Sequence, residues 1–568
     1  MKYKRLIFFI SLLMLVYALS GAVRYRQHII IMNSPAHHAG NDIIMVSNDS
    51  YRWLRYSGKY TAGTDGLSGF PQQASVPWFR PLLPEMIDFV SSASGLSPEV
   101  SSSLLTVFLS GLFIFPLGLF FYLIGYPASG IGAAVTGSLS FIYLSRTTAF
   151  QADTDSLNLF FMFLTPLFIR LTDKKLYLFS ALAGVSCLLH YYWYFHGVFT
   201  FMWLAVLSGY LIYAKRGVRQ TVWALLLFLF FSGIFPAFEV LGNLRSFISP
   251  ETVRSWHQNV DELRVHGFGD TLGLLGAYKY PVLTGLMLCV FLFRRIFLIL
   301  PVMALGLLVF LRGERFGMYL APFAGAGIGF LCQYAVRRAG RFAYLLSLSL
   351  AFFLCVFLVR PHLDFVPAPY VSSGVYSAVK EAPVAKGSLA LCGWNHGFLV
   401  EYLKGVRCSS DGATQFKEGS RLTQQAIASV NNVKEPLLGL SAGNDMFIFI
   451  FSEDYAVSGG DGLYYFAPCG EDGDCSGIRL GNQVAVGKIL FLGRTGQGDN
   501  EKREPVFGVL AEDRSGLAVF DNKTTQSLFG KTFIIGSPDI SCVKKVYRKF
   551  PYTAVYKASY DCLSSHGE

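Results

Sequence analysis

The most constraining feature of this sequence is a series of long apolar segments that fills residues 5–360 and then stops. Apolar runs of roughly 17–25 residues with few charges are typical of helices that cross a lipid bilayer. The chain of 568 residues is 52% hydrophobic and 15% aromatic, which is too apolar for a soluble enzyme of this length. We therefore predict a polytopic, α-helical membrane domain over residues 1–360.

The apolar part of the chain divides into eleven predicted spans. The first follows the basic start "MKYKR", and it is interpreted as a retained span rather than a cleaved signal peptide because it is long and further spans follow. The predicted spans are 5–21, 102–124, 128–144, 156–171, 177–195, 197–213, 220–237, 276–293, 296–311, 316–335 and 342–360.

The positions of the basic residues predict the orientation of these spans. Clusters of Lys and Arg at 170–175, 215–219, 293–295 and 337–341 all fall on the side of the N-terminus, which the positive-inside rule assigns to the cytoplasm. The loops 22–101, 145–155 and 238–275 fall on the outer side. The net charge of +11 is then explained by orientation and contact with lipid headgroups, so no nucleic-acid partner is predicted.

The sequence after residue 360 has a different character. It is mixed and polar, with turn segments such as "SGGDG", and its 361–568 range is long enough for a core of its own. The segments 385–394, 444–452 and 484–493 read as strands and 418–430 reads as a helix. We predict a mixed α/β soluble domain on the outer side of the membrane.

Acidic residues gather in the predicted outer loops. Asp49 lies in the first loop, and Asp153 and Asp155 lie in the short loop before the fourth span. Carboxylates are the ligands that a hard divalent cation such as Mg²⁺ or Mn²⁺ prefers, and two of them at i and i+2 are able to face one ion. The alternative is that these acids meet water or stabilise the positive N-terminus of the following helix.

Several motifs occur in an order that resembles the catalytic subunit of oligosaccharyltransferases in its single-subunit bacterial form. They are an acid in the first outer loop, "SRTTAFQADTDS" before the fourth span, the aromatic run "LLHYYWYFHG", the segment "GERFGMYLAP", "GWNHG" after the last span and the tail "VKKVYRKFPYTAVYKA". The resemblance extends nearly from end to end. It implies a membrane domain of about 11–13 transmembrane helices of the glycosyltransferase-C type; the family usually has thirteen, so one helical hairpin is missing or two spans are merged.

The resemblance implies transfer of a glycan from a polyprenyl-pyrophosphate lipid to the asparagine of Asn-x-Ser/Thr in an acceptor protein or peptide. In that reading Asp49, Asp153 and Asp155 hold Mn²⁺ or Mg²⁺, while Asp49 and Glu262 weaken the conjugation of the acceptor amide. Arg315 holds the acceptor or orients charge near it. Glu251 is the alternative to Glu262, because the family's T-I-x-E pattern reads Asn-Val-Asp-Glu here.

The resemblance also suggests two binding regions. Donor binding falls to Arg146 and to the aromatic residues Tyr192, Trp193 and Tyr194, although Arg146 is open to two other roles, orienting the acid pair or lying at the interface as an ordinary arginine.

Acceptor binding falls to Trp394, Asn395 and His396. They occupy the position of the family's WWDYG motif, which recognises the hydroxyl of the +2 Ser or Thr of the acceptor. Gly393 replaces the first Trp, Asn395 the Asp and His396 the Tyr, so altered recognition is expected. The alternative is a buried turn of the soluble domain.

The cysteines divide between the two predicted domains. Cys187, Cys289, Cys332 and Cys355 lie in spans and are interpreted as small hydrophobic residues. The soluble domain holds Cys392, Cys408, Cys469, Cys475, Cys542 and Cys562, an even set that permits up to three disulfides in an oxidising compartment. The pairs 469–475 and 542–562 suggest themselves by position, and 392–408 would then brace "GWNHG".

Two other classes of protein are alternatives. A membrane glycosyltransferase that uses a polyprenyl-phosphate sugar to modify lipid, polysaccharide or protein hydroxyls would share the acidic loops, but it would not explain "GWNHG" together with "GERFGMYLAP". A transporter is disfavoured because the acids lie in loops and not within the spans. The expected protein is a monomer without accessory subunits in a bacterial inner membrane, with its N-terminus in the cytoplasm and its soluble domain in the periplasm.

Overall fold

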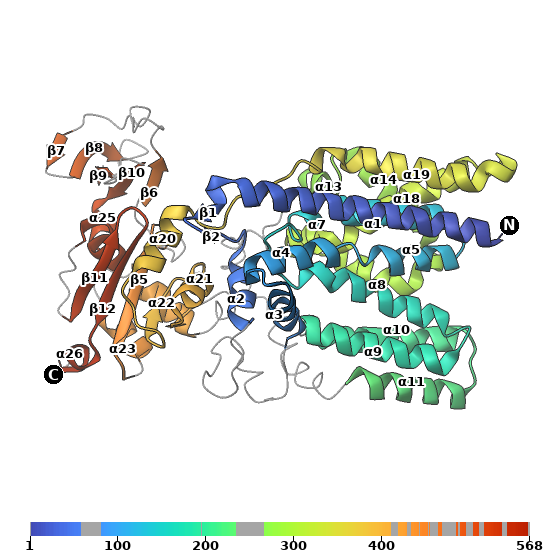
Figure 1. The fold of residues 1–568 in the computed structure, drawn as a ribbon, viewed down its shortest axis with the longest axis horizontal. Helices are drawn as coiled ribbons and strands as arrows, with labels where there is room; N and C mark the ends of the chain where they lie inside the picture. The colour runs from blue at the N-terminus through green and yellow to red at the C-terminus, as the bar shows by residue number, and fades with distance from the viewer. Residues whose placement is uncertain are drawn as a thin grey trace. The chain divides into compact units, whose positions relative to one another are not determined.

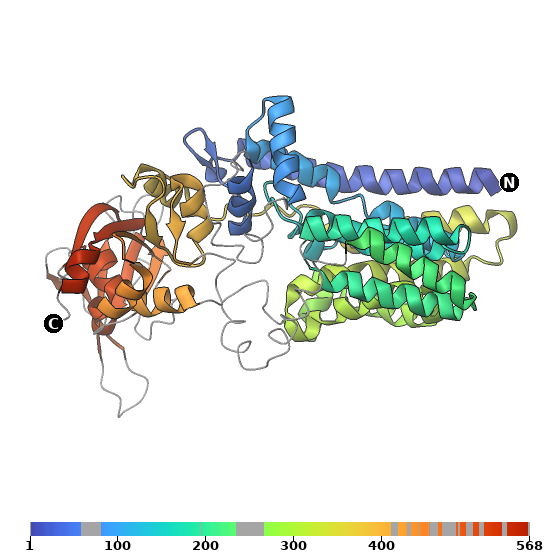
Figure 2. The same ribbon diagram turned by 90° about the horizontal axis from the view of Figure 1, so that it is seen from below.

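The computed structural model describes most of the chain. The described residues are 2–57, 81–194, 196–233, 266–410, 418–428, 433–441, 443–452, 454, 464–468, 484–486, 489–495, 504–510, 516–536 and 542–565. They form two compact units (Figures 1 and 2): unit 1 comprises residues 1–34 and 79–368, and unit 2 comprises residues 35–78 and 369–568.

This division differs from the predicted boundary at residue 360. Residues 35–57 belong to unit 2, although the sequence assigns them to a loop of the membrane domain. The reason is local packing, because helix α2 (Asn48–Tyr56) lies against α21 (Gly397–Lys404), where the centroid of the buried Tyr51 ring lies 5.6 Å from that of Tyr402. The described parts of the predicted loop 22–101, residues 22–57 and 81–101, are also largely helical, since α1 continues to Asn33 and α3 (Leu82–Ser94) precedes α4.

Unit 1 is a bundle of helices, drawn side by side in Figure 1. Besides α1 (Lys2–Asn33) and α3 it contains α4 (Pro98–Leu109), α5 (Ile114–Leu123), α6 (Pro127–Leu139), α7 (Phe141–Leu144), α8 (Asp155–Leu171), α9 (Leu176–Tyr194), α10 (Val198–Tyr213), α11 (Val218–Ser232), α13 (Phe268–Leu275), α14 (Lys279–Cys289), α15 (Phe293–Ile296), α16 (Leu300–Leu307), α17 (Val309–Arg312), α18 (Gly317–Ala335) and α19 (Ala343–Val359).

The predicted spans all overlap helices of unit 1. Among the described residues, six helical runs are long and apolar enough to cross a membrane: Tyr3–Asn33, Pro98–Leu123, Leu176–Tyr194, Lys279–Arg312, Glu314–Ala335 and Ala343–His362. Two shorter apolar helices are α10 and α11. The predicted helical membrane domain is therefore confirmed, whereas the count of eleven spans stays a prediction.

The run Lys279–Arg312 contains two antiparallel segments, as the predicted spans 276–293 and 296–311 require. A Cβ atom on Gly285 would lie 2.2 Å from the carbonyl oxygen of Ala324, and one on Gly306 would lie 2.6 Å from the amide nitrogen of Leu320. A straight helix would separate positions 285 and 306 by about 30 Å. Because both contact nearly the same turn of α18, the chain must reverse between them.

Small residues allow α6 and α18 to pack backbone to backbone. A Cβ on Gly132 would lie 2.2 Å from the carbonyl oxygen of Gly325, and one on Gly325 would lie 2.1 Å from that of Gly132. The hydroxyl of Thr136 also donates to the carbonyl oxygen of Ala321 at 3.0 Å. Such close contact between small residues is a common way for helices to associate where the surrounding solvent is apolar.

Unit 2 contains two five-stranded sheets. The first is mixed and has the order β11-β12-β5-β3-β4, from β11 (Val543–Lys549), β12 (Thr553–Ala558), β5 (Met446–Phe451), β3 (Leu389–Leu391) and β4 (Arg407–Cys408). The second is antiparallel and has the order β6-β10-β9-β8-β7, from β6 (Tyr464–Pro468), β10 (Gly516–Asp521), β9 (Glu504–Leu510), β8 (Ile489–Thr495) and β7 (Val484–Val486).

Helices complete the mixed architecture that the sequence predicts for the soluble part. They are α20 (Ser373–Glu381), α21, α22 (Glu418–Ala428), α23 (Lys434–Ser441), α25 (Asn522–Gln526) and α26 (Tyr560–Ser565). The segments read as strands contain β3, β5, β7 and β8, and the predicted helix coincides with α22. The tail motif forms the antiparallel pair β11–β12.

Candidate active site

The two acids of the "DTD" segment lie at the start of α8 in unit 1. Asp155 is the first residue of the helix, where the positive end of the helix dipole stabilises a negative charge, and Asp153 lies in the preceding turn. Both side chains are buried: Asp155 is 1% exposed and Asp153 is 8% exposed. The alternative that these acids simply meet water is therefore wrong for this structure, although α8 does start at Asp155.

Arg146 contacts both acids. Its Nε lies 2.5 Å from Asp155 Oδ2 and its NH2 group lies 3.4 Å from Asp153 Oδ2, which are the contacts that an orienting role requires; the role itself stays a prediction. One guanidinium thus faces two carboxylates in a buried place. Asp155 Oδ1 is buried and accepts no hydrogen bond from the described residues. A buried carboxylate oxygen without a donor invites a cation.

The donor set of unit 1 fits part of a divalent-cation site. Asp153 and Asp155 supply oxygen ligands of the type that Mn²⁺ and Mg²⁺ prefer, and Asp155 Oδ1 is available to one. Within the described ranges, no cluster of three or more His, Cys, Asp or Glu residues has the geometry of a metal site. The third predicted ligand, Asp49, lies in the first turn of α2 and belongs to unit 2.

The aromatic run at the end of α9 supports the acidic loop. The indole Nε1 of Trp193, which is fully buried, donates to the carbonyl oxygen of Thr154 at 2.6 Å. The hydroxyl of Tyr194 accepts from the guanidinium of Arg315 at 3.2 Å. Arg315 lies in a short 3-10 turn, Glu314–Phe316, which leads into α18. Two of the predicted donor-binding residues thus connect the acid pair and the arginine within unit 1; Tyr192 is half-buried beside them.

A buried polar network beneath the acids was not predicted. The amide of Asn158 donates to the hydroxyl of Tyr319 at 2.6 Å, and its oxygen lies 2.9 Å from Nε2 of His190. These side chains come from α8, α18 and α9. Polar residues within apolar spans are rare and are usually functional or paired. The presence of Asn158 and His190 within two predicted spans is therefore the sequence signal from which this network could have been predicted.

The acidic loop is also anchored to α1 by residues that sequence reasoning did not single out. Arg24 is fully buried; its Nε donates to the carbonyl oxygen of Thr147 at 2.8 Å, and its NH2 group donates to the Thr147 hydroxyl at 2.5 Å. The side-chain oxygen of Gln27 accepts from the hydroxyl of Thr148 at 3.0 Å. These bonds explain why α1 extends well past the predicted span 5–21.

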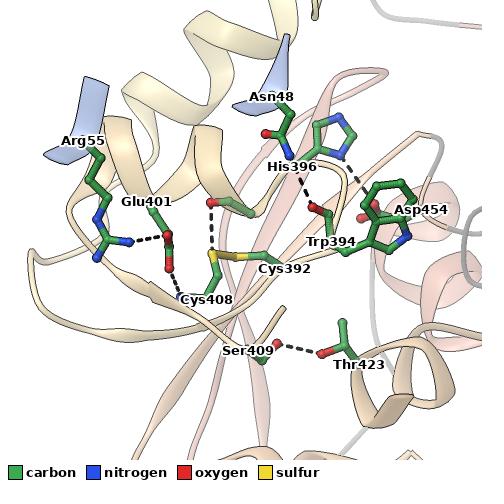
Figure 3. The surroundings of a disulfide bond; sticks show 11 residues. Asn48, Arg55, Cys392, Trp394, His396, Glu401, Cys408, Ser409, Thr423 and Asp454 are labelled. Atoms are coloured by element: carbon green, nitrogen blue, oxygen red, sulfur yellow. Dashed lines mark hydrogen bonds and ion pairs between the residues drawn. A yellow bond between two sulfur atoms is a disulfide. The ribbon is translucent and has the colours of Figure 1, made fainter. Parts of the chain in front are cut away.

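The segment "GWNHG" forms the turn between β3 and α21 in unit 2. Asn395 is 7% exposed and His396 is 1% exposed, whereas Trp394 is half-buried. The imidazole of His396 stacks on Phe451 with ring centroids 4.1 Å apart. The side-chain amide of Asn48 in α2 donates to the carbonyl oxygen of Trp394 at 3.4 Å (Figure 3), so the first outer loop supports this turn.

Two of the three candidate disulfides are present. Cys392–Cys408 joins the residue after β3 to β4 directly beside "GWNHG" (Figure 3), and Cys542–Cys562 joins the start of β11 to α26. Cys469 and Cys475 lie outside the described residues, as do Glu262 and its alternative Glu251. The four cysteines of the predicted spans are free and buried, as expected.

The chain resembles proteins of known activity in sequence. It is 22% identical over 442 residues to the undecaprenyl-diphosphooligosaccharide–protein glycotransferase of two strains of Campylobacter jejuni, in an alignment that includes 66% of this chain. The chain spans 60% of the length of these curated relatives. No protein-family model matches it.

The fold is shared with solved structures. The archaeal oligosaccharyltransferase AglB from Archaeoglobus fulgidus, in complex with an inhibitory peptide and a dolichol-phosphate, superposes with a TM-score of 0.59 at 11% identity, over 95% of this chain and 79% of that one. The same enzyme in the apo form gives a TM-score of 0.58 over 95% of this chain. The chain is therefore similar in sequence to the Campylobacter glycotransferases and shares the fold of the archaeal oligosaccharyltransferase.

Proposed function

We propose that this protein transfers a glycan en bloc from a polyprenyl-pyrophosphate lipid to the asparagine of Asn-x-Ser/Thr in acceptor proteins. The observation that carries the proposal is the buried cluster of Asp153, Asp155 and Arg146, held at the head of α8 beside the Tyr194–Arg315 contact. The archaeal and Campylobacter relatives, which are named for this kind of transfer, support it.

The residues take distinct roles in this proposal. Asp153, Asp155 and Asp49 would hold Mn²⁺ or Mg²⁺, which when bound would offset the negative charge that develops on the pyrophosphate leaving group. Arg146 orients the acid pair. Asp49 and Glu262 accept hydrogen bonds from the acceptor amide and weaken its conjugation, so that its nitrogen becomes nucleophilic.

The aromatic residues Tyr192, Trp193 and Tyr194 bind the lipid-linked donor in this proposal, and Arg315 orients charge beside them. Trp394, Asn395 and His396 bind the +2 residue of the acceptor. We place the protein in the inner membrane as a monomer without accessory subunits, with its N-terminus in the cytoplasm and unit 2 in the periplasm.

The test uses the full-length protein in detergent with Mn²⁺ and a polyprenyl-pyrophosphate oligosaccharide. Fluorescent peptides that contain Asn-x-Thr, Gln-x-Thr or Asn-x-Ala serve as acceptors, and transfer is read as a gel shift. The expected result is a shift of the Asn-x-Thr peptide alone, which EDTA abolishes. The variant Asp155→Asn should lose about a hundredfold in rate, because it weakens the charge stabilisation of the leaving group.

The matched control is Asp173→Asn. Asp173 follows α8 at its other end and pairs with Arg170, so the variant removes an acid from the same hairpin without touching the buried cluster. It should keep the wild-type rate. If no peptide shifts while the donor lipid stays intact, the proposal fails, and a polyprenyl-phosphate-sugar-dependent transferase becomes the better reading.

A further inference from the structure

A buried aspartate outside the motif converges on the "GWNHG" turn. Asp454 follows β5 and is 1% exposed. Its Oδ2 accepts the amide N–H of Phe451 at 2.8 Å, which holds the carboxylate at the end of the strand, and its Oδ1 lies 3.7 Å from Nδ1 of His396 (Figure 3). The two segments are more than fifty residues apart in the chain, so sequence spacing does not reveal this contact.

The carboxylate of Asp454 occupies the place that a side chain at position 393 would need. A Cβ atom on Gly393 would lie 2.5 Å from Asp454 Oδ1 and 2.8 Å from Asn395 Oδ1, both closer than real Cβ contacts. The oxygens of Asp454 and Asn395 therefore approach the same point from different segments. The absence of a side chain at Gly393 is what allows them to meet.

The presence of Asp454 also explains why position 395 is an asparagine rather than the aspartate of the family motif. An aspartate at position 395 would bring a second carboxylate to this buried point, and two like charges at such a distance oppose each other's ionisation. An asparagine offers an acceptor oxygen of the same shape without the charge. His396 completes the arrangement, because its imidazole lies beside the one carboxylate and its ring is fixed by stacking on Phe451.

The polar atoms of this cluster match a ligand hydroxyl. Asn395 Oδ1 is a buried acceptor, and Trp394 Nε1 is a buried donor; neither has a hydrogen-bond partner among the described residues. A hydroxyl is the smallest side-chain group that is able to satisfy either kind of atom, because it both donates and accepts a hydrogen bond. A carboxylate makes a stronger acceptor for that hydroxyl than an amide oxygen does.

We propose that Asp454 supplies the carboxylate of the acceptor-binding site and makes this chain specific for the +2 hydroxyl. The inference rests on the proposed function. It explains the three departures of "GWNHG" from the family pattern by one residue: Gly393 makes room for the carboxylate of Asp454, Asn395 avoids a second charge, and His396 orients the first.

The experiment compares Asp454→Asn, Asn395→Asp and the double variant with the wild type, using the full-length protein, Mn²⁺ and the donor lipid described above. Asparagine at position 454 keeps an oxygen for the Phe451 amide, so the turn is preserved. We expect the KM for the Asn-x-Thr peptide to rise about tenfold in each single variant, with kcat changed less than threefold. Asp454→Asn loses one charge-assisted hydrogen bond, which costs on that order. Asn395→Asp brings a second buried carboxylate beside the first, and the two oppose each other's ionisation. In the double variant the carboxylate returns at position 395, and the KM should fall to within about threefold of the wild-type value.

Asp445→Asn is the control for general damage to β5. Asp445 precedes the other end of this strand and pairs with Lys557 at 2.8 Å on the surface, so this variant should keep the wild-type KM. A merely structural role for Asp454 predicts additive losses in the double variant, with no rescue, and that result overturns the inference. An unchanged KM in Asp454→Asn overturns it as well while leaving the proposed function intact. No transfer by the wild type would overturn both.

Discussion

The guanidinium of Arg146 lies 2.5 Å from a carboxylate oxygen of Asp155, and both side chains are almost completely buried. The pair stands in the loop that carries the predicted metal ligands, with Asp153 3.4 Å away on the same arginine. A buried ion pair of this kind is costly to break, because the remaining charge loses its partner without regaining water. Arg146 therefore couples the stability of the loop to its chemistry.

Removal of this arginine should destabilise the protein and increase its dependence on metal. Arg146→Ala is expected to cost about 3–5 kcal/mol, because two buried carboxylates then repel each other. Added Mn²⁺ should recover more of the lost thermal stability in the variant than it adds to the wild type. Thermal unfolding in detergent, with EDTA or with Mn²⁺, measures both effects.

The control for that experiment is Arg26→Ala. Arg26 pairs with Asp364 at 2.7 Å, but the two side chains are 51% and 81% exposed, so the pair is worth at most about 1 kcal/mol. Equal losses of stability in the two variants would contradict the role assigned to Arg146.

Replacement of Arg24 should lower activity more than stability. Arg24 is buried, and no carboxylate of the described residues pairs with it; its guanidinium donates hydrogen bonds to Thr147, Ser138 and Ser20. In Arg24→Met the desolvation cost of the buried charge disappears together with the hydrogen bonds, so the melting temperature should change by only a few degrees. The loop before Asp153 loses its anchor, and we expect kcat to fall about tenfold with the peptide KM unchanged. A large fall in melting temperature at full activity would assign Arg24 a purely structural role.

Loss of the two disulfides should have different consequences. Cys392–Cys408 braces the residue next to "GWNHG", and Cys542–Cys562 lies at the C-terminal edge of the sheet. Each closes a loop of similar length, so Cys408→Ser and Cys562→Ser should each cost about 3 kcal/mol of unfolding free energy. Only Cys408→Ser should also raise the KM for the acceptor peptide. A raised KM in both variants would mean that the effect follows from stability alone.

One surface cluster makes a contribution that depends on pH. The hydroxyl of Tyr547 donates to Glu381 at 2.7 Å, and Lys549 lies 3.2 Å from the same carboxylate; these contacts lower the pKa of Glu381. A lowered folded-state pKa stabilises the fold above the unfolded-state value of about 4.3, and this contribution is lost as the pH falls through the folded-state pKa. Glu381→Gln should therefore lower the melting temperature slightly at pH 7, and by less at pH 3 than at pH 7. A difference that is constant across this range would contradict the assignment.

The position of the helices could be predicted from the sequence, because hydropathy is a property of consecutive residues. Long apolar runs have few stable conformations other than a helix that satisfies its own backbone hydrogen bonds. The acidic loop and the disulfides 392–408 and 542–562 were found for a similar reason, since their members are close in the chain. The order of the motifs along the chain indicated the resemblance to oligosaccharyltransferases.

Contacts between distant segments were decided by the tertiary structure alone. The sequence of residues 35–57 does not predict that α2 packs on α21, because a short polar helix is compatible with either unit. In the sequence, Arg24 follows an apolar span, and its burial against the loop that contains Thr147 is seen only in the structure. Asp454 lies beside Gly393 only because β3 and β5 pair in the sheet. Hydropathy and motifs describe each segment by itself, whereas burial of a charge depends on which segment covers it, and that choice is made by the packing of the whole chain.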